Sequence, residues 1–251
     1  METMEFWIAA TVAAVIVGLS KGGIPAIGML AVPIMALTIS PVAAVGMLLP
    51  VYLVSDVLGI WSWRRNWSGK VLALIMPGAI AGTLLAWMTA EIVPNAAVTL
   101  LIGLLGFFYS AITLLRPDDA RPPAQPKVLP GAFWGAVTGF TSFVSYAGSP
   151  PFQIYVLPLR LDKATFVGTS TVTFAILNFA KIVPYAMMGQ LDVPAMMQSI
   201  YMMPPAILAV LAGVRLVKVI PGRSFFRAVI WALLLLSIKL VWDGAKGLGW
   251  A

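Results

Sequence analysis

A glycine-rich segment near the start of the chain places a lysine within an otherwise apolar run. Residues 18–25 are Gly-Leu-Ser-Lys-Gly-Gly-Ile-Pro. Glycine permits unwound backbone, and proline suits the first turn of a helix. A helix that begins inside a membrane attracts anions through its unpaired N–H groups. We therefore predict an anion-binding site formed by Ser20, Lys21, Gly22, Gly23 and Pro25. The alternative is that Lys21 reaches the membrane surface and the glycines only allow close helix packing.

A second break of the same kind lies in the other half of the chain. Residues 142–153 contain hydroxyl, amide, glycine and proline residues in place of a continuous apolar run. We predict that this segment adds neutral donors beside another helix start, from Ser145, Tyr146, Gly148, Ser149, Pro150 and Gln153. The alternative is a polar kink whose groups bond only to their own backbone.

Polar residues also interrupt two apolar stretches that follow these breaks. Ser170, Asn178 and Lys181 lie within residues 164–187, and Asp56 lies within residues 41–62. An ionisable residue inside a membrane segment is a functional candidate by default. We predict that Ser170, Asn178 and Lys181 help to bind substrate. Asp56 is expected to pair with Lys21 or Lys181 or to carry a coupling proton. The alternative is a purely structural role, as an ion pair or as a hydrogen-bonded neutral acid.

The composition identifies the environment in which these residues act. The 251 residues are 61% hydrophobic and only 10% charged, whereas soluble domains carry about 25% charged residues. The chain contains no Cys and no His, which excludes disulfides, thiolate chemistry and the commonest general base. We expect no cofactor and no metal. The net charge of +7 lies in short loops, which indicates membrane orientation rather than a nucleic-acid partner.

The chain divides into two halves of similar pattern. Residues 1–115 form a first transmembrane repeat, 116–130 a polar cytoplasmic linker, and 131–251 a second repeat. In a comparison of the two halves, Gly46 matches Gly168 and Asp56 falls opposite Asn178. Each half has a broken first element (6–39 and 131–158). Three further helices follow in each half, at 41–62, 70–90 and 95–115, and at 164–187, 194–214 and 224–242.

The loop charges decide how these elements cross the membrane. If every element crossed once, giving eight spans, twelve basic residues would split evenly between the two sides. If each broken element is a re-entrant hairpin, all twelve fall on the cytoplasmic side and both termini lie outside. These residues are Arg64, Arg65, Lys70, Arg116, Arg121, Lys127, Arg160, Lys163, Arg215, Lys218, Arg223 and Arg227. We therefore predict an all-α membrane protein of two inverted repeats. Each is a broken or re-entrant hairpin, or two short spans, followed by three transmembrane helices, and the two breaks meet near the midplane.

These residues resemble the sulfite exporter TauE/SafE family of membrane transporters. The resemblance is carried by Gly18, Lys21-Gly22-Gly23, Pro25 and Pro33, and by the counterparts Gly139, Gly148-Ser149-Pro150 and Pro158. It covers nearly the whole chain and implies export of sulfite, sulfonates or related sulfur-containing anions. The second half departs from the first by having Tyr146 where the first has Lys21. This departure leaves the charge of the substrate open.

Together with this resemblance, the sequence predicts a secondary transporter that exports a small sulfur-containing anion across the cell inner membrane by alternating access. Its partners are the anion and the lipid bilayer, and a homodimer is compatible with the sequence. The alternatives are a channel, or a cation or proton-coupled carrier for another solute. An enzyme is not expected, because the chain has no His and its nine acids lie mostly in loops.

Overall fold

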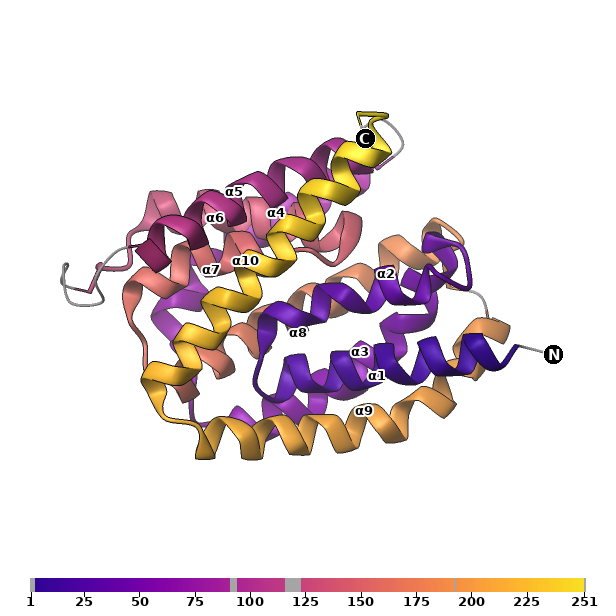
Figure 1. Ribbon diagram of the computed structural model, residues 1–251, viewed down its shortest axis with the longest axis horizontal. Coiled ribbons are helices and arrows are strands. Elements are labelled where there is room, and N and C mark those ends of the chain that lie inside the picture. The colour runs from indigo at the N-terminus through magenta and orange to yellow at the C-terminus, as the bar shows by residue number, and fades with distance from the viewer. Residues whose placement is uncertain (1–2, 91–93, 116–122, 192, 251) are drawn as a thin grey trace. The chain divides into compact units, whose positions relative to one another are not determined.

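A computed structural model describes residues 3–90, 94–115, 123–191 and 193–250. The described residues form α-helices and two 3-10 helices, with no β-strand among them (Figure 1). In chain order these are α1 (Met4–Gly22), η1 (Pro25–Leu30), α2 (Ala31–Met35), α3 (Pro41–Trp63), α4 (Gly69–Thr89), α5 (Asn95–Leu115), α6 (Val128–Ser145), α7 (Ser149–Val156), η2 (Leu157–Leu159), α8 (Lys163–Met187), α9 (Val193–Val219) and α10 (Gly222–Gly247).

The helices have the length and composition that a bilayer requires. Among the described residues, seven are long and apolar enough to cross a membrane: α1, α3, α4, α6, α8, α9 and α10. α5 contributes a shorter apolar helix within Thr99–Leu115. A helix hydrogen-bonds all its interior backbone groups within itself, which is why it can cross hydrocarbon. The predicted all-α membrane fold is confirmed.

The order of elements is also the predicted one. Each half has a broken first element followed by three longer helices, and most boundaries lie within a few residues of those expected. The predicted linker 116–130 falls partly outside the described residues. Residues 123–127 form no helix, and α6 already begins at Val128. The division into repeats at this linker stays a prediction.

The first arm of the first broken element extends into the predicted break. α1 runs 19 residues and ends at Gly22, within the segment 18–25 that the sequence marked as the break. Gly23 and Ile24 then leave the helix, and both of their N–H groups donate to the Leu19 carbonyl, at 2.9 and 3.0 Å. Pro25 starts η1, and α2 runs back alongside α1 (Figure 1). The first element is therefore a hairpin with one long and one short arm.

The chain forms two compact units that do not follow the order of the sequence. The first unit comprises Met1–Trp67 and Val167–Ile220, and the second Ser68–Phe166 and Pro221–Ala251. In the first unit, α9 packs against α1 and α3. In the second unit, α4 packs against α6 and α5 packs against α10. Each unit therefore combines helices from both halves of the sequence.

Glycines bring α1 and α9 close together in the first unit. A Cβ at Gly18 would lie 2.1 Å from the Ala206 carbonyl oxygen, and one at Gly22 would lie 2.3 Å from that of Val210. The two contacts are one helical turn apart on both helices, so α1 and α9 run parallel. Small residues four apart are the usual way in which membrane helices approach closely. This packing fixes the end of α1 that carries Lys21.

Candidate functional site

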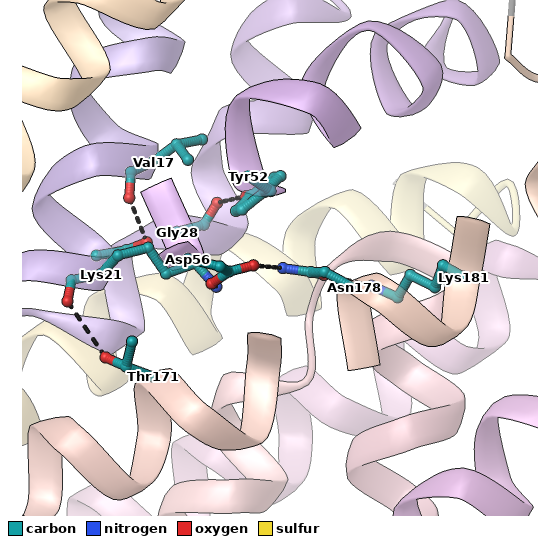
Figure 2. Close-up of polar contacts among 9 residues, drawn as sticks. Val17, Lys21, Gly28, Tyr52, Asp56, Thr171, Asn178 and Lys181 are labelled. Carbon is teal, nitrogen blue, oxygen red and sulfur yellow. Dashed lines mark hydrogen bonds and ion pairs between the residues drawn. The ribbon is translucent and has the colours of Figure 1, made fainter. Parts of the chain in front are cut away.

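The site is built around Lys21, in the last turn of α1. Its side chain is only 6% exposed, and its ammonium group lies 2.7 Å from Oδ1 of Asp56 on α3. The Asp56 side chain is completely buried. The sequence left Lys21 and Lys181 as possible partners of Asp56, and in the structure Asp56 forms its ion pair with Lys21. Figure 2 shows the two side chains meeting across the helices.

Asn178 holds the other oxygen of the same carboxylate. Its Nδ2 donates to Asp56 Oδ2 at 2.7 Å, and its Oδ1 accepts a hydrogen bond from Lys181 Nζ at 3.3 Å. This orientation of the amide is the one that gives an acceptor to Lys181 and a donor to Asp56. Asn178 and Lys181 are both buried on α8, beyond Asp56 as seen from Lys21 (Figure 2).

The four side chains form one continuous polar chain inside the first unit. It runs from Lys21 through Asp56 and Asn178 to Lys181, and we call it the lysine–aspartate cluster. It places Lys21 directly against the carboxylate and Lys181 on the far side of Asn178. In a medium of low dielectric constant, such charges interact much more strongly than they do in water. The cluster can therefore respond strongly to any further charge that enters it.

Aromatic rings and a threonine surround Lys21 at its end of the cluster. The Lys21 ammonium lies 5.2 Å from the ring centroid of Tyr52 and 5.6 Å from that of Phe174. The Tyr52 hydroxyl donates to the Gly28 carbonyl at 2.7 Å, and the Thr171 hydroxyl donates to the Lys21 carbonyl at 3.2 Å. These bonds tie α3 and α8 to the break (Figure 2). They restrict Lys21 to a defined environment.

The sequence did not identify Tyr52 or Phe174. One signal was available for Tyr52, which lies four residues before Asp56 and therefore on the same face of α3. Phe174 has the same spacing relative to Asn178 on α8. Aromatic residues at this spacing are common in apolar helices, so the spacing alone does not separate a site residue from core packing.

The first break does not supply the amide cradle that the sequence predicted. Ser20, Lys21 and Gly22 belong to α1, where they form its C-terminal turn rather than the start of a helix. The Ser20 hydroxyl donates to the Val17 carbonyl at 2.7 Å, within its own helix. η1, which begins at Pro25, is a 3-10 helix of six residues. The expectation of unwound backbone at residues 20–22 is wrong, because the helix continues to Gly22. The positive charge at this break therefore comes from the Lys21 side chain and not from the start of a helix.

The second break offers fewer N–H groups than expected. α6 ends at Ser145, and Tyr146 adopts the left-handed conformation with φ of 56°. α7 starts at Ser149, and the next two residues are Pro150 and Pro151, which have no N–H. The Ser145 hydroxyl bonds back to Thr141 O at 3.4 Å. The start of α7 is therefore a poor amide cradle.

Side chains provide the polar character of this second break. Gln153 is completely buried, and its Nε2 donates to Ser149 Oγ at 2.9 Å. Its Oε1 is buried and has no hydrogen-bond partner among the described residues. Tyr146, Gly148 and Pro150 surround the break and are also buried. The second break is therefore a neutral polar site in the second unit.

The remaining predicted residue, Ser170, is buried on α8 in the first unit, on the same helix as Asn178 and Lys181. The cluster thus collects Lys21, Asp56, Asn178 and Lys181. The second break holds its own residues together in the other unit. The predicted meeting of residues 20–25 with residues 145–151 stays a prediction, and so do the substrate and coupling roles of all these residues.

The long apolar helices among the described residues are those of a multi-pass membrane protein. Comparison with protein families matches residues 10–240 to the family described as Sulfite exporter TauE/SafE. The chain belongs to this family, as the resemblance in the sequence indicated. No curated protein and no solved structure matched the chain.

Proposed function

We propose that the protein is a secondary transporter that exports a small sulfur-containing anion, sulfite or an organosulfonate, by alternating access. The family supports the substrate class. The observation that carries the proposal is the buried lysine–aspartate cluster, in which Lys21 pairs with Asp56 and Lys181 is linked to the same carboxylate through Asn178. Lysine is expensive within hydrocarbon and is retained there for function.

The cluster suits an anion better than a cation. A cation carrier requires an ionised Asp56 that faces the solute, with Lys21 turned away. Instead, the Lys21 ammonium occupies the position next to Asp56 Oδ1 at 2.7 Å. An anion approaching Lys21 meets attraction from its ammonium group. In this proposal, Ser170, which is buried on the same helix as Asn178 and Lys181, adds a neutral hydrogen bond that helps to select the shape of the anion.

The proposal also fixes an orientation in the membrane. The basic loop residues lie in the cytoplasm, and both termini lie outside the inner membrane. Under alternating access, one set of helices moves relative to the other, so that the site opens to each side in turn. The protein then needs no nucleotide, and the sequence contains no nucleotide-binding motif.

Ligand-induced thermal stabilisation tests this function on the purified protein in detergent. Sulfite and methanesulfonate are expected to raise the apparent stability, by about 2.7 kcal/mol at a hundred times Kd, whereas simple carboxylates do so less. Lys21→Ala is expected to abolish the stabilisation. Lys239→Ala is the matched control, because Lys239 pairs with Asp243 in an exposed position on α10.

The outcomes of these measurements test the substrate class and the assignment of Lys21 separately. If no sulfur-containing anion stabilises the wild-type protein, the proposed substrate class is wrong. If Lys21→Ala keeps the full stabilisation, the anion binds elsewhere. The double variant Lys21→Ala/Asp56→Asn repeats the test without an unpaired buried charge, in case the single variant unfolds. Currents in a planar bilayer far above carrier rates would instead identify a channel.

A further inference from the structure

In this buried site, the single positive charge of Lys21 cannot neutralise both the Asp56 carboxylate and a transported anion. Its ammonium contacts Asp56 Oδ1 at 2.7 Å, and both side chains are almost fully buried. Among the described residues, Asp56 is the one buried carboxylate. A second negative charge beside Lys21 would face the carboxylate across a short distance in a low-dielectric environment, where like charges repel strongly. One of the two negative charges must therefore be neutralised.

We propose that the transported anion and Asp56 compete for Lys21, so that each monoanion bound takes up one proton at Asp56. This inference rests on the proposed function, and it identifies the coupling ion of the same site. In the empty form, the Lys21 ammonium is paired with the Asp56 carboxylate. In the loaded form, the ammonium is paired with the anion and Asp56 is a neutral acid.

The exchange balances in charge and atoms. One proton from water binds Asp56 Oδ1, the oxygen that faces Lys21. The lysine keeps its own three protons and turns from this oxygen to the anion. The proton adds +1 and the anion adds −1, so the net charge of the cluster is the same in both forms. No other bond is made or broken.

Asn178 keeps Asp56 in place during this exchange, because it binds the carboxylate oxygen that is not protonated. Its Nδ2 donates to Asp56 Oδ2 at 2.7 Å, and a neutral carboxyl group still accepts this bond at its carbonyl oxygen. Asp56 therefore keeps its place when Lys21 leaves it. Asn178 is a positioning residue, and the flexible four-carbon stem of lysine provides the movement.

Several other titratable groups surround Asp56. Lys21 from α1 and Lys181 from α8 are the charged groups that act on it. The phenols of Tyr52 on α3 and Tyr185 on α8 lie nearby, and ordinary phenols are already protonated at neutral pH. Among these groups, the Asp56 carboxylate is the one that lies against the Lys21 ammonium, so it is the group that a bound anion would displace.

The exchange has a consequence for transport. Both the empty and the loaded forms carry the same buried charge, so neither crosses the membrane field with an extra charge. Moving one elementary charge across 100 mV involves about 2.3 kcal/mol, and this exchange avoids that term. Export of a monoanion is then electroneutral, and one proton leaves with each anion.

Isothermal titration of the purified protein with methanesulfonate tests the proposal. Methanesulfonate stays a monoanion over the working range, so any proton exchanged belongs to the protein. Titrations in two buffers of different ionisation enthalpy give the number of protons taken up. The expected number is about one for the wild type, with Kd rising about tenfold per pH unit above neutral. For Asp56→Asn the expected number is zero, with tighter binding that does not depend on pH.

Asp243→Asn is the matched control, since it removes the acid of the exposed Lys239–Asp243 pair, and it should still take up one proton. Binding by the wild type without proton uptake would overturn the coupling while leaving the proposed function intact. Uptake of one proton by Asp56→Asn would overturn the assignment to Asp56. If neither methanesulfonate nor sulfite binds the wild type, the proposed function itself fails. Proton release into a dye-loaded vesicle during wild-type transport provides the same test without any variant.

Discussion

At the scale of single residues, Lys21 and Asp56 depend on each other to remain charged inside the membrane. Each is buried, and the ion pair at 2.7 Å compensates both charges. Removing one member of a buried pair leaves an uncompensated charge, which costs more than the pair itself contributes. The pair therefore serves two purposes. It stabilises the empty protein, and it keeps a positive charge ready for an anion.

A pair of variants tests this dependence. Lys21→Ala is expected to destabilise the protein by about 3–5 kcal/mol, because Asp56 then lacks its ammonium partner. The double variant Lys21→Ala/Asp56→Asn should recover a large part of this loss, since the buried charge is gone. Thermal unfolding in detergent without ligand measures both. Equal destabilisation in the single and double variants would show that the lysine contributes by packing and not by charge.

The sequence identified the members of the cluster but not their connections. Lys21, Asp56, Asn178 and Lys181 stood out because polar side chains are rare in such apolar runs. Two lysines were available to Asp56, and nothing in their spacing along the chain decides between them. The choice follows from tertiary packing, since the last turn of α1 lies against α3 while Asn178 comes between Asp56 and Lys181.

At the scale of elements, the sequence was accurate about helices and less accurate about their breaks. Prolines, glycines and loop charges mark the helix ends well, and α3 and α8 begin and end within one residue of the prediction. The break after Gly22 was placed too early because glycine permits unwinding without requiring it. At the second break, Pro150 and Pro151 mark a helix start but also remove its N–H groups.

The packing of α1 on α9 leads to a prediction at this scale. Gly22→Ala would place a Cβ 2.3 Å from the Val210 carbonyl oxygen, so the two helices must separate near Lys21. We expect a destabilisation of about 1–3 kcal/mol, together with weaker anion binding because Lys21 is displaced. Thermal unfolding and anion titration measure the two effects. Gly222→Ala is the control, since a Cβ there has no atom within 4 Å, and an equal effect of both changes would refute this reasoning.

At the scale of the whole molecule, each unit packs helices from one half of the sequence against helices from the other half. In the first unit, Asp56 bonds to Asn178, its counterpart in the comparison of the halves. A Cβ at Gly46 would lie 2.0 Å from the Gln190 carbonyl oxygen. One at its counterpart Gly168 would lie 1.7 Å from that of Asn66. Position 46 lies near residue 190, and position 168 near residue 66, so α3 and α8 run in opposite directions.

The second unit shows the corresponding exchange. α6 packs on α4 through contacts of Gly78 with Ala132 and of Gly82 with Ala136, just as α1 packs in parallel on α9 in the first unit. In both cases the first helix of one half lies parallel to the third long element of the other. In an inverted repeat, equivalent helices of the two halves run antiparallel, and each half packs its first helix on the third element of the other half. These contacts support the inverted repeat, which remains a prediction.

Single cysteines can test the topology directly, because the chain contains no cysteine of its own. Gln125 and Ser224 lie in exposed segments, one between the halves and one near the start of α10. If each broken element crosses once, these two positions lie on opposite sides of the membrane. If each is a hairpin, both lie in the cytoplasm, while Met4 and Trp250 near the termini lie outside.

A maleimide that does not cross membranes distinguishes these cases on intact cells. We expect Met4→Cys and Trp250→Cys to react before the cells are permeabilised, and Gln125→Cys and Ser224→Cys to react only afterwards. All four side chains are exposed, so access to the reagent is set by the membrane and not by burial. Reaction of Gln125→Cys and Ser224→Cys from opposite sides would refute the inverted repeat. In that case α1 and α6 would enter from the same side, and the two breaks could not approach the substrate from opposite faces of the membrane.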